Sequence, residues 1–327
     1  MTIKEKLALK AKPVEIALAN YLKIREPKKL YEAMAHIPLA GGKRLRPVMS
    51  LLTCEMVGGN SEKAIPFATS LEIIHNFTLV HDDVMDDDDL RHGVAACHTV
   101  YGLPTAILAG DSLFSYAFEM IAECKIKDKI KSDLVRHVAY TVRRIAEGQQ
   151  MDINFEEEET VDTKDYLEMI RLKTSILFGS AAYGGALIGG TNKEQAKELR
   201  QMAIWVGLGF QIWDDYLDAT APAEILGKPS GSDIRQGKRT LLVIDALNRA
   251  KSNERKELIR ILDSEENTED DVKKAVQIMK KSGALEHCHT QAMGYLEGAK
   301  KTLEKYPENE ARRLLEELLE YMVTRGH

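Results

Sequence analysis

The sequence predicts an all-α protein, and three observations support this prediction. Apolar residues recur at helical spacing nearly throughout the 327 residues, while alternating strand patterns bounded by turn pairs are hard to find. Only nine prolines occur, and most stand at plausible helix boundaries, as Pro13, Pro27, Pro104 and Pro307 do. No fixed-period repeat and no composition shift divides the chain, so a solenoid and a linker are both unexpected. We expect one large helical domain spanning residues 1–327.

The first half of the chain is expected to form helices separated by glycine-rich breaks. Glycine pairs at 41–42 and 58–59 interrupt the apolar pattern, and Arg91-His-Gly93 is expected to be a loop. The expected helices of this half cover residues 3–22, 28–37, 44–57, 62–86, 104–124 and 129–154.

The second half continues in the same way. A helix over residues 163–187 is expected to close at Gly189-Gly190, and Thr191-Asn-Lys-Glu194 is a capping-box signature for the next helix. That helix has an apolar stripe at Leu199, Met202, Val206, Phe210 and Trp213. Residues 227–239 are expected to form a polar, Gly-rich loop. Residues 240–324 are expected to form helical hairpins with breaks near 264–267, Gly283 and Pro307.

Composition excludes several classes of protein. The formal net charge of −6 gives no support for nucleic-acid binding. The four cysteines are scattered without a Cys-x-x-Cys pair, which is typical of a reducing compartment rather than a disulfide scaffold. The N-terminus carries mixed charges and no apolar segment, so no signal peptide is expected. No uncharged apolar run long enough for a transmembrane helix appears, and we expect a cytoplasmic protein.

Two aspartate clusters with the same spacing are the clearest candidates for chemistry. Asp82, Asp83 and Asp86 stand at i, i+1 and i+4, so Asp82 and Asp86 share one face of a helix. Like charges at that spacing repel each other, and a cation placed between them reverses the effect. Taken alone, an acidic run of this kind is most often a solvated surface.

The second cluster favours a metal site. Asp214, Asp215 and Asp218 repeat the spacing within an otherwise apolar segment that begins at Gly209, where acids do not serve solubility. Carboxylate oxygens suit Mg²⁺, which takes one or two carboxylates together with waters and substrate phosphates. Both clusters are expected at the C-terminal ends of long helices, where the helix dipole also favours a cation. All six aspartates are therefore candidate metal ligands.

A metal-loaded cleft requires an anionic ligand, and a basic segment that could bind one lies near the N-terminus. The segment Gly41-Gly-Lys-Arg-Leu-Arg-Pro47 places Lys43 and Arg46 just before or within the first turn of a helix. Helix-start amides and two cations make a phosphate site, although a basic helix start on the surface would look the same. His75 lies two turns before the first cluster, and such a histidine is alone more often a core residue.

Further candidate cations lie in the second half. Lys173 stands inside an apolar helical run, either as a snorkelling side chain or as a charge that faces a cleft. Lys228 and Lys238 lie on the Gly-rich loop directly after the second cluster. A charged loop is usually just solvated, but this position favours a role in binding.

Taken together and in this order, the motifs resemble the trans-isoprenyl diphosphate synthase (polyprenyl synthetase) family, in particular archaeal-type short-chain geranylgeranyl diphosphate synthases. The similarity is strongest from Gly41 to Thr240. Besides the two clusters and the basic segment, it includes Arg91 with Gly93, Gly110-Asp-Ser-Leu113, Gly148-Gln149 with Asp152, and Lys173-Thr174. Each motif is weak alone, whereas the whole set in register is specific.

The resemblance implies a single-domain isoprenoid-synthase helical bundle around a deep central cavity, generally as a homodimer. The two aspartate clusters would face each other across the cavity mouth and hold three Mg²⁺ ions against the diphosphate of an allylic substrate. By the same analogy, that diphosphate would also contact Arg91, Lys173, Thr174, Gln211, Lys228 and Lys238. The diphosphate of isopentenyl diphosphate would be held by Lys43, Arg46, His75 and His92.

The implied activity is a Mg²⁺-dependent prenyl transfer. Dimethylallyl, geranyl or farnesyl diphosphate would ionise to a carbocation while the metal site and Lys173 stabilise the departing diphosphate. The double bond of isopentenyl diphosphate would attack the cation, and loss of a proton would complete the condensation. The scheme needs no side-chain nucleophile, and we recognise no nucleophilic triad in the sequence.

Product length is expected to depend on the residues before the first cluster. In the family, a bulky residue five positions before that motif limits elongation, and here it is Phe77, followed by the small Thr78. The pattern predicts mainly geranylgeranyl diphosphate, with farnesyl diphosphate as the alternative product. An ordinary core aromatic is the other interpretation of Phe77.

The sequence departs from the family pattern at one position. The family has Arg-Arg-Gly after the first motif, whereas this chain has Arg91-His92-Gly93. A histidine is mostly neutral at pH 7 and has no bidentate fork, so a weaker and more pH-dependent grip on isopentenyl diphosphate is expected. A low-activity or regulatory paralogue is therefore an alternative function.

Two other enzyme classes compete with this interpretation. A di-iron carboxylate bundle uses Glu-x-x-His pairs, and both Glu72–His75 and Glu286–His289 have that spacing. This alternative leaves the aspartate clusters and the Gly-Lys loop unexplained. A terpene cyclase shares the fold and the first cluster, but the second cluster and the basic segment favour condensation.

Overall fold

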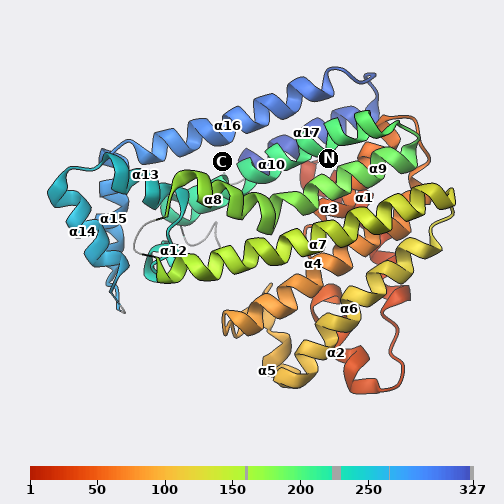
Figure 1. Ribbon diagram of the computed structural model, residues 1–327, viewed down its shortest axis with the longest axis horizontal. Helices are drawn as coiled ribbons and strands as arrows, with labels where there is room; N and C mark the ends of the chain where they lie inside the picture. The colour runs from red at the N-terminus through yellow and green to blue at the C-terminus, as the bar shows by residue number, and fades with distance from the viewer. Residues whose placement is uncertain (159–160, 223–229, 265, 325–327) are drawn as a thin grey trace. The chain divides into compact units, whose positions relative to one another are not determined.

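The computed structural model describes residues 1–158, 161–222, 230–264 and 266–324 (Figure 1). Its described elements are helices, apart from an antiparallel hairpin of β1 (Leu90–Arg91) and β2 (Val94–Ala95). The predicted all-α class is confirmed. Contacts divide the chain into two compact units, each built from three separate segments. Unit 1 comprises Met1–Val142, Leu177–Gln201 and Glu304–Leu318, and unit 2 comprises Arg143–Ile176, Met202–Leu303 and Leu319–His327.

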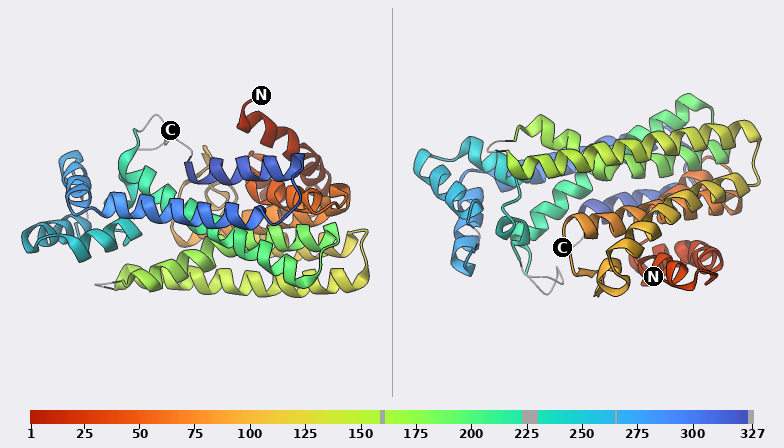
Figure 2. Two further views of the ribbon diagram at one scale, coloured as in Figure 1. Left: turned by 90° about the horizontal axis from the view of Figure 1, so that it is seen from above. Right: turned by 60° about the horizontal axis from the view of Figure 1, so that its bottom comes forward.

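Unit 1 is organised around one long apolar helix, α4, which begins with a proline in its first turn and buries most of its length. It packs against α6 most extensively and also against α1, α2 and α3, and α4 (orange) and α6 (yellow) run side by side in both ribbon figures (Figures 1 and 2). The elements are α1 (Ile3–Tyr21), α2 (Lys28–Leu39), α3 (Leu45–Met56), η1 (Ser61–Ala64), α4 (Ile65–Met85), α5 (Cys97–Tyr101) and α6 (Leu103–Glu123).

The middle of the chain contains two short elements that lie in unit 2 alone, α8 (Thr163–Ile170) and the π-helical turn η2 (Arg171–Ser175), and three longer helices that contribute residues to both units. The longer helices are α7 (Asp128–Glu157), α9 (Ile176–Gly189) and α10 (Lys193–Thr220). The predicted stripe of α10 is buried at Leu199, Met202, Val206 and Trp213, because these side chains fall on one helical face.

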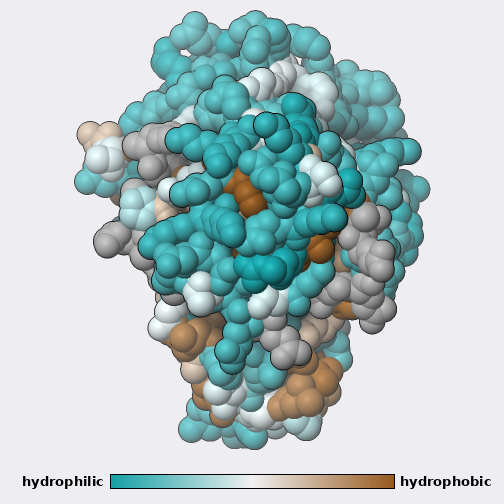
Figure 3. Space-filling view, turned by 90° about the vertical axis from the view of Figure 1, so that its left-hand side faces the viewer, coloured by the Kyte–Doolittle hydropathy of each residue, from teal (hydrophilic) through white to brown (hydrophobic). Residues whose placement is uncertain are grey.

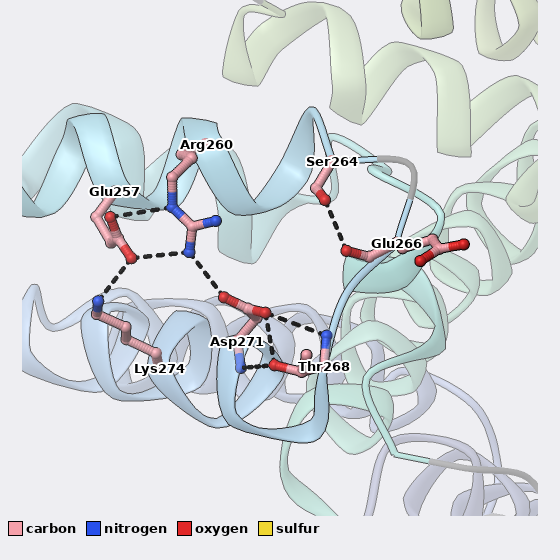
Figure 4. A network of polar contacts seen from close by, with 7 residues as sticks. All are labelled: Glu257, Arg260, Ser264, Glu266, Thr268, Asp271 and Lys274. Carbon is pink, nitrogen blue, oxygen red and sulfur yellow. Dashed lines mark hydrogen bonds and ion pairs between the residues drawn. The ribbon is translucent and has the colours of Figure 1, made fainter.

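The C-terminal part of the chain is made of shorter helices. They are α12 (Ser232–Arg235), α13 (Leu241–Arg249), α14 (Ser252–Leu262), α15 (Glu269–Lys281), α16 (Ala284–Leu303) and α17 (Glu310–Thr324). The surface over α14 and α15 is mainly hydrophilic (Figure 3). Charged contacts join these two helices, because Arg260 of α14 contacts Glu257 on its own helix and Asp271 on α15 (Figure 4).

Several local predictions were wrong. The expected helix over 163–187 is interrupted by the π turn η2, and Pro13 lies inside α1 rather than at a boundary. The cap of α10 is Asn192, whose Oδ1 accepts the Gln195 amide at 2.9 Å, so the capping box at Thr191 is not formed. The Gly-rich loop contains the short helix α12. The loop expected at 91–93 is confirmed for His92 and Gly93, which form the turn of the β1–β2 hairpin, while Arg91 belongs to strand β1.

No helix in the described ranges is long and apolar enough to cross a membrane.

Candidate functional site

The first aspartate cluster lies at the C-terminal end of α4, as predicted. Asp82 is half-buried, Asp83 is fully buried, and Asp86 is the exposed C-cap residue. The Nε of Arg91 donates to Asp83 Oδ1 at 2.6 Å, and a second guanidinium nitrogen lies 3.3 Å from Asp88. Burial raises the pKa of Asp83, and the hydrogen bond from Arg91 opposes that shift. The middle carboxylate is thus held by a cation.

The second cluster lies in the last two turns of α10, and its middle carboxylate has a different setting. The Tyr166 hydroxyl donates to Asp215 Oδ2 at 2.5 Å, and the Gln211 amide donates to Oδ1 at 3.1 Å. Burial and the nearby charge of Asp233 raise the pKa of Asp215 to about 7. Asp218 is also buried, and its two oxygens accept from the Ser232 hydroxyl at 2.6 Å and the Asp233 amide at 3.0 Å. Asp218 therefore anchors α12.

The donor chemistry of the two clusters fits Mg²⁺. Within the described ranges, no three acidic, histidine or cysteine side chains gather into a group that could hold a metal ion alone. Mg²⁺ does not require such a group, because it keeps waters and shares substrate phosphates. Asp82 and Asp214 are half-buried rather than enclosed, and Asp83 Oδ2 is buried without a hydrogen-bond partner. A cation at this end of α4 would satisfy that oxygen.

The residues expected to bind isopentenyl diphosphate gather in unit 1. Burial lowers the pKa of His75 well below its usual value, and the charges of Arg46, His92, Arg44 and Arg91 lower it further, so all of these groups lie close to it. Arg46 stacks over the Phe178 ring at 4.3 Å, and burial lowers its pKa to about 10. These groups form a cation-rich surface on α3, α4 and the β1–β2 hairpin, which suits an anion.

His92 joins this cation-rich surface from the turn of the β hairpin. It is exposed and has a left-handed backbone with φ of 52°. Burial and the neighbouring charges of Arg91 and Arg44 lower its pKa, so the imidazole is neutral at pH 7. His92 therefore lies close to His75. Lys43 is exposed and directly precedes Arg44, the N-cap residue of α3.

Lys173 and Thr174 lie in the π turn η2, which the helical pattern did not predict. Lys173 Nζ contacts Asp152 of α7 at 2.5 Å, and the Thr174 hydroxyl donates to Gln211 Oε1 at 3.2 Å. A Cβ on Gly148 of α7 would lie 2.5 Å from the Lys173 amide nitrogen, so only glycine allows this approach. Single π turns inside α-helices are frequent at functional sites. This turn links the predicted Gly148-Gln149, Asp152 and Lys173-Thr174 motifs in unit 2.

Phe77 belongs to a row of aromatic side chains between α4 and α6. Its ring centroid lies 5.4 Å from that of Phe114, which in turn lies 5.2 Å from Phe118. Phe77 is also 5.2 Å from His81, whose Nε2 lies 3.1 Å from the Ile107 carbonyl oxygen. Thr78, beside Phe77, donates its hydroxyl to the His75 carbonyl. All three phenyl rings are only partly buried, so they line accessible space rather than fill the core.

The structure adds two residues that the sequence reasoning missed. Tyr166 holds Asp215, and Arg44 is a buried member of the basic segment. The only sequence signal for Arg44 was its own positive charge within the basic segment. No sequence signal indicated Tyr166. Lys228 lies outside the described residues, and Lys238 is exposed with its amide donating to the Asp233 carbonyl at 2.9 Å. Glu72 of the di-iron alternative pairs with Arg44 at 2.7 Å, which argues against a role as an iron ligand.

Comparisons with known proteins agree with the arrangement within each unit. The family model described as polyprenyl synthetase matches residues 27–279. A geranylgeranyl pyrophosphate synthase of Geoglobus acetivorans is 43% identical over 99% of this chain and 100% of its own. A geranylfarnesyl diphosphate synthase of Aeropyrum pernix is 41% identical over 91% of this chain and 95% of its own.

The fold is also that of a solved relative. The crystal structure of a geranylgeranyl pyrophosphate synthetase from Pyrococcus horikoshii has a TM-score of 0.93 and 40% identity, and the match covers 99% of this chain and 97% of that one. The chain therefore belongs to the polyprenyl synthetase family, as its motifs predicted, and is a prenyl-transferring enzyme.

Proposed function

We propose that the protein condenses isopentenyl diphosphate with allylic diphosphates and releases mainly geranylgeranyl diphosphate. One observation carries this proposal. The helix α4 bears His75 of the cation-rich surface and, two turns later, the first aspartate cluster. An anion site and a metal-type site on one helix suit two diphosphate substrates. The relatives named above support geranylgeranyl diphosphate as the main product, with geranylfarnesyl diphosphate as a longer alternative.

Use of Mg²⁺ fits the family, and we propose that three ions are bound. The six aspartates would hold them, and when bound they stabilise negative charge on the leaving diphosphate. Lys173 and Thr174 would contact the same diphosphate from the π turn, with Arg91, Gln211, Lys228 and Lys238. Since Asp152 contacts Lys173, it orients the lysine before substrate arrives. A preorganised cation of this kind stabilises developing charge without reorganisation.

Lys43, Arg46, His75 and His92 would bind isopentenyl diphosphate. The neutral pair His75 and His92 would donate N–H groups, and a bound diphosphate would raise the pKa of both. Substituting His92→Arg should therefore lower the KM for isopentenyl diphosphate and flatten its rise between pH 6 and 8. A KM that is already flat over this range, and that does not fall in the variant, would contradict this role.

Product analysis is the experiment that tests the function. Purified protein is incubated with Mg²⁺, isopentenyl diphosphate and, separately, dimethylallyl, geranyl and farnesyl diphosphates, and products are identified by mass. A twenty-carbon diphosphate from all three primers is expected. If elongation stops at fifteen carbons, the proposed condensation reaction is still correct, but the protein is a farnesyl diphosphate synthase. Binding of substrates without elongation would instead support the low-activity or regulatory paralogue.

We propose that the row of phenyl rings from Phe77 to Phe118 limits the length of the product. Replacing Phe77 by Ala removes the ring that precedes the first cluster and should shift the main product beyond twenty carbons. The matched control is Phe114→Leu, which keeps an apolar side chain and should shift the distribution less. An unchanged product in Phe77→Ala would make this residue an ordinary packing residue.

We further propose a homodimer that uses an apolar stripe on α5 and α6. Val100 of α5 and Leu103, Ile107 and Leu108 of α6 have 50%, 52%, 41% and 56% of their surface exposed, which is unusual for a monomer. Light scattering on Leu108→Glu is expected to show a monomer, and a retained dimer would exclude this face. That the two units form one domain, and that the protein is cytoplasmic, also stay predictions.

A further inference from the structure

Arg44 is a buried arginine at the centre of the basic segment, and only 3% of its surface is exposed. Its Nε donates to Glu15 Oε1 of α1 at 2.7 Å and its Nη1 to Glu72 Oε1 of α4 at 2.7 Å. Its Nη2 donates to the Pro38 carbonyl oxygen of α2 at 2.5 Å. One guanidinium thus ties three helices to the start of α3, and its side chain faces away from solvent.

The backbone around Arg44 is shaped by these contacts. Arg44 is the N-cap residue of α3 and has a left-handed conformation with φ of 47°, which costs a non-glycine residue free energy. Gly42 has φ of 151°, and a Cβ there would lie 3.1 Å from Arg44 Nη1. The side chain of Arg44 therefore folds back over the Gly-Gly turn. The turn and the first turn of α3 carry Lys43 and Arg46, the two cations assigned to isopentenyl diphosphate.

Arg44 also controls a charge near the proposed anion site. Glu72 is 3% exposed and lies one turn before His75 on α4. Its charge raises the pKa of Arg46 against the lowering caused by burial, so its carboxylate acts on the same cations that would meet a diphosphate. Without Arg44, this buried carboxylate would keep only the 3.4 Å hydrogen bond from Asn76 Nδ2 and would compete with the substrate for Arg46.

We propose that Arg44 is a positioning residue for isopentenyl diphosphate. It holds the Gly-Gly-Lys turn against α1, α2 and α4, and it neutralises Glu72 so that Arg46 and His75 are available to the diphosphate. Arg44 itself does not touch the substrate. The inference rests on the proposed function, because that function assigns isopentenyl diphosphate to this surface.

The test compares the two substrates in the full-length enzyme. Arg44→Gln removes the ion pairs and leaves the Glu72 charge buried, so the KM for isopentenyl diphosphate should rise at least about tenfold. The KM for farnesyl diphosphate should change less than about twofold. The double variant Arg44→Gln with Glu72→Gln removes the stranded carboxylate and should recover most of the lost affinity. A purely structural role would lower the active fraction, and hence kcat, without this split.

Arg312→Gln is the matched control, because Arg312 in the same unit also bonds one carboxylate, Glu316, and one carbonyl oxygen, that of Tyr306. It should lower the melting temperature without changing the KM for isopentenyl diphosphate. If Arg44→Gln does not fold, Glu15→Gln loosens one contact and should raise that KM about two- to fourfold. An unchanged KM in a folded variant overturns the inference, as does an equal rise for both substrates.

Calorimetry separates failure of the inference from failure of the proposed function. Isopentenyl diphosphate is titrated into wild type and Arg44→Gln in the presence of a chelator, since the surface is made of side-chain cations. Weaker binding in the variant supports the inference even if no product forms. Equal binding in both proteins refutes it, while loss of condensation in the wild type refutes only the proposed function.

Discussion

The two aspartate clusters have the same spacing but different surroundings. In unit 1 the middle carboxylate, Asp83, is paired with the guanidinium of Arg91, which opposes the rise in pKa caused by burial. In unit 2 the middle carboxylate, Asp215, is held by the neutral donors Tyr166 and Gln211. The charge of Asp233 adds to the effect of burial there.

This difference teaches that an Asp-Asp-x-x-Asp pattern specifies where carboxylates stand on a helix but not their charge. Arg91 opposes the rise in the pKa of Asp83, whereas burial and the charge of Asp233 raise the pKa of Asp215 to about 7 despite its two neutral donors. The clusters also differ at their third position, because Asp86 is exposed and Asp218 is occupied by α12. The first positions, Asp82 and Asp214, are both half-buried and are the most alike.

The largest expected effect comes from the first positions. Asp82→Ala and Asp214→Ala should each lower kcat by about 10³, because a metal ion contributes several kcal/mol of charge stabilisation in the transition state. Steady-state kinetics over a range of Mg²⁺ concentrations measures the loss. Asp89→Ala, an exposed acid in the same run as Asp82, is the control and should be nearly neutral. If kcat falls strongly in only one of the two variants, the two clusters also differ at their first positions.

The middle positions should differ in stability. Asp83→Asn leaves Arg91 with only its longer contact to Asp88 and should lower the free energy of unfolding by about 3 kcal/mol, as expected when one partner of a buried ion pair is removed. Asp215→Asn keeps an acceptor for Tyr166 and removes a carboxylate whose ionisation is unfavourable in the folded protein, so it should not lower the free energy of unfolding at pH 8. Urea unfolding of both variants measures the contrast. If both variants lose the same free energy of unfolding, the ion pair with Arg91 does not make Asp83 different from Asp215.

The pH dependence of stability should reveal Asp215 directly. Its pKa in the folded protein is about 7, well above the value near 4 of an unfolded chain, so the folded state holds a proton that the unfolded state has lost. The stability contribution is complete below about pH 4 and is lost as the pH rises to 7. In metal-free protein, this proton should make the free energy of unfolding fall by about 1.4 kcal/mol per pH unit in that window.

Asp215→Asn is the matched test of this slope, because the amide cannot titrate. Unfolding of wild type and variant is compared from pH 4 to pH 8 in the presence of a chelator. Tyr166→Phe should move the upper end of the window to higher pH, since its hydrogen bond lowers the pKa of Asp215. A wild type and an Asp215→Asn variant with identical pH profiles would contradict the raised pKa.

The sequence predicted what depends on periodicity. The all-α class follows from apolar spacing, and the placement of both clusters at the ends of α4 and α10 follows from where those patterns stop. The aromatic row at Phe77 and the cation-rich surface could not be derived this way, because they depend on which helices pack together. For the cations and Phe77, the family resemblance supplied the expectation.

Features that depend on tertiary contacts were missed. The π turn at Lys173 forms where glycines of neighbouring helices allow close approach, Gly148 on one side and Gly207, whose Cβ would lie 2.7 Å from Ser175 Cα, on the other. The pattern of residues 163–187 is compatible with a regular helix and does not mark this turn. Tyr166 is remote in sequence from Asp215, so no local pattern could reveal their hydrogen bond.

The smallest expected effect comes from the carboxylate–arginine contacts on α14 and α15, which test whether burial rather than residue type sets the strength of the Asp83–Arg91 pair. Arg260 contacts Glu257 at 3.0 Å and Asp271 at 2.7 Å on an exposed face, and Lys274 also reaches Glu257 (Figure 4). Hydrogen bonds from Arg260 and Lys274 lower the pKa of Glu257 to about 2. Water and salt screen such exposed pairs.

Arg260→Ala should therefore lower the melting temperature by at most about 2 °C in dilute buffer and by nothing measurable in 1 M salt. Because the folded pKa of Glu257 lies below its unfolded value, this contribution is present above about pH 4.5 and disappears as the pH falls toward 2. Differential scanning calorimetry of Arg260→Ala beside Asp83→Asn, at low and high salt, measures both. If Arg260→Ala lowers the melting temperature as much as Asp83→Asn does, and if salt removes both effects, burial does not strengthen the Asp83–Arg91 ion pair. A loss in Asp83→Asn that persists in 1 M salt would show that burial shields its ion pair.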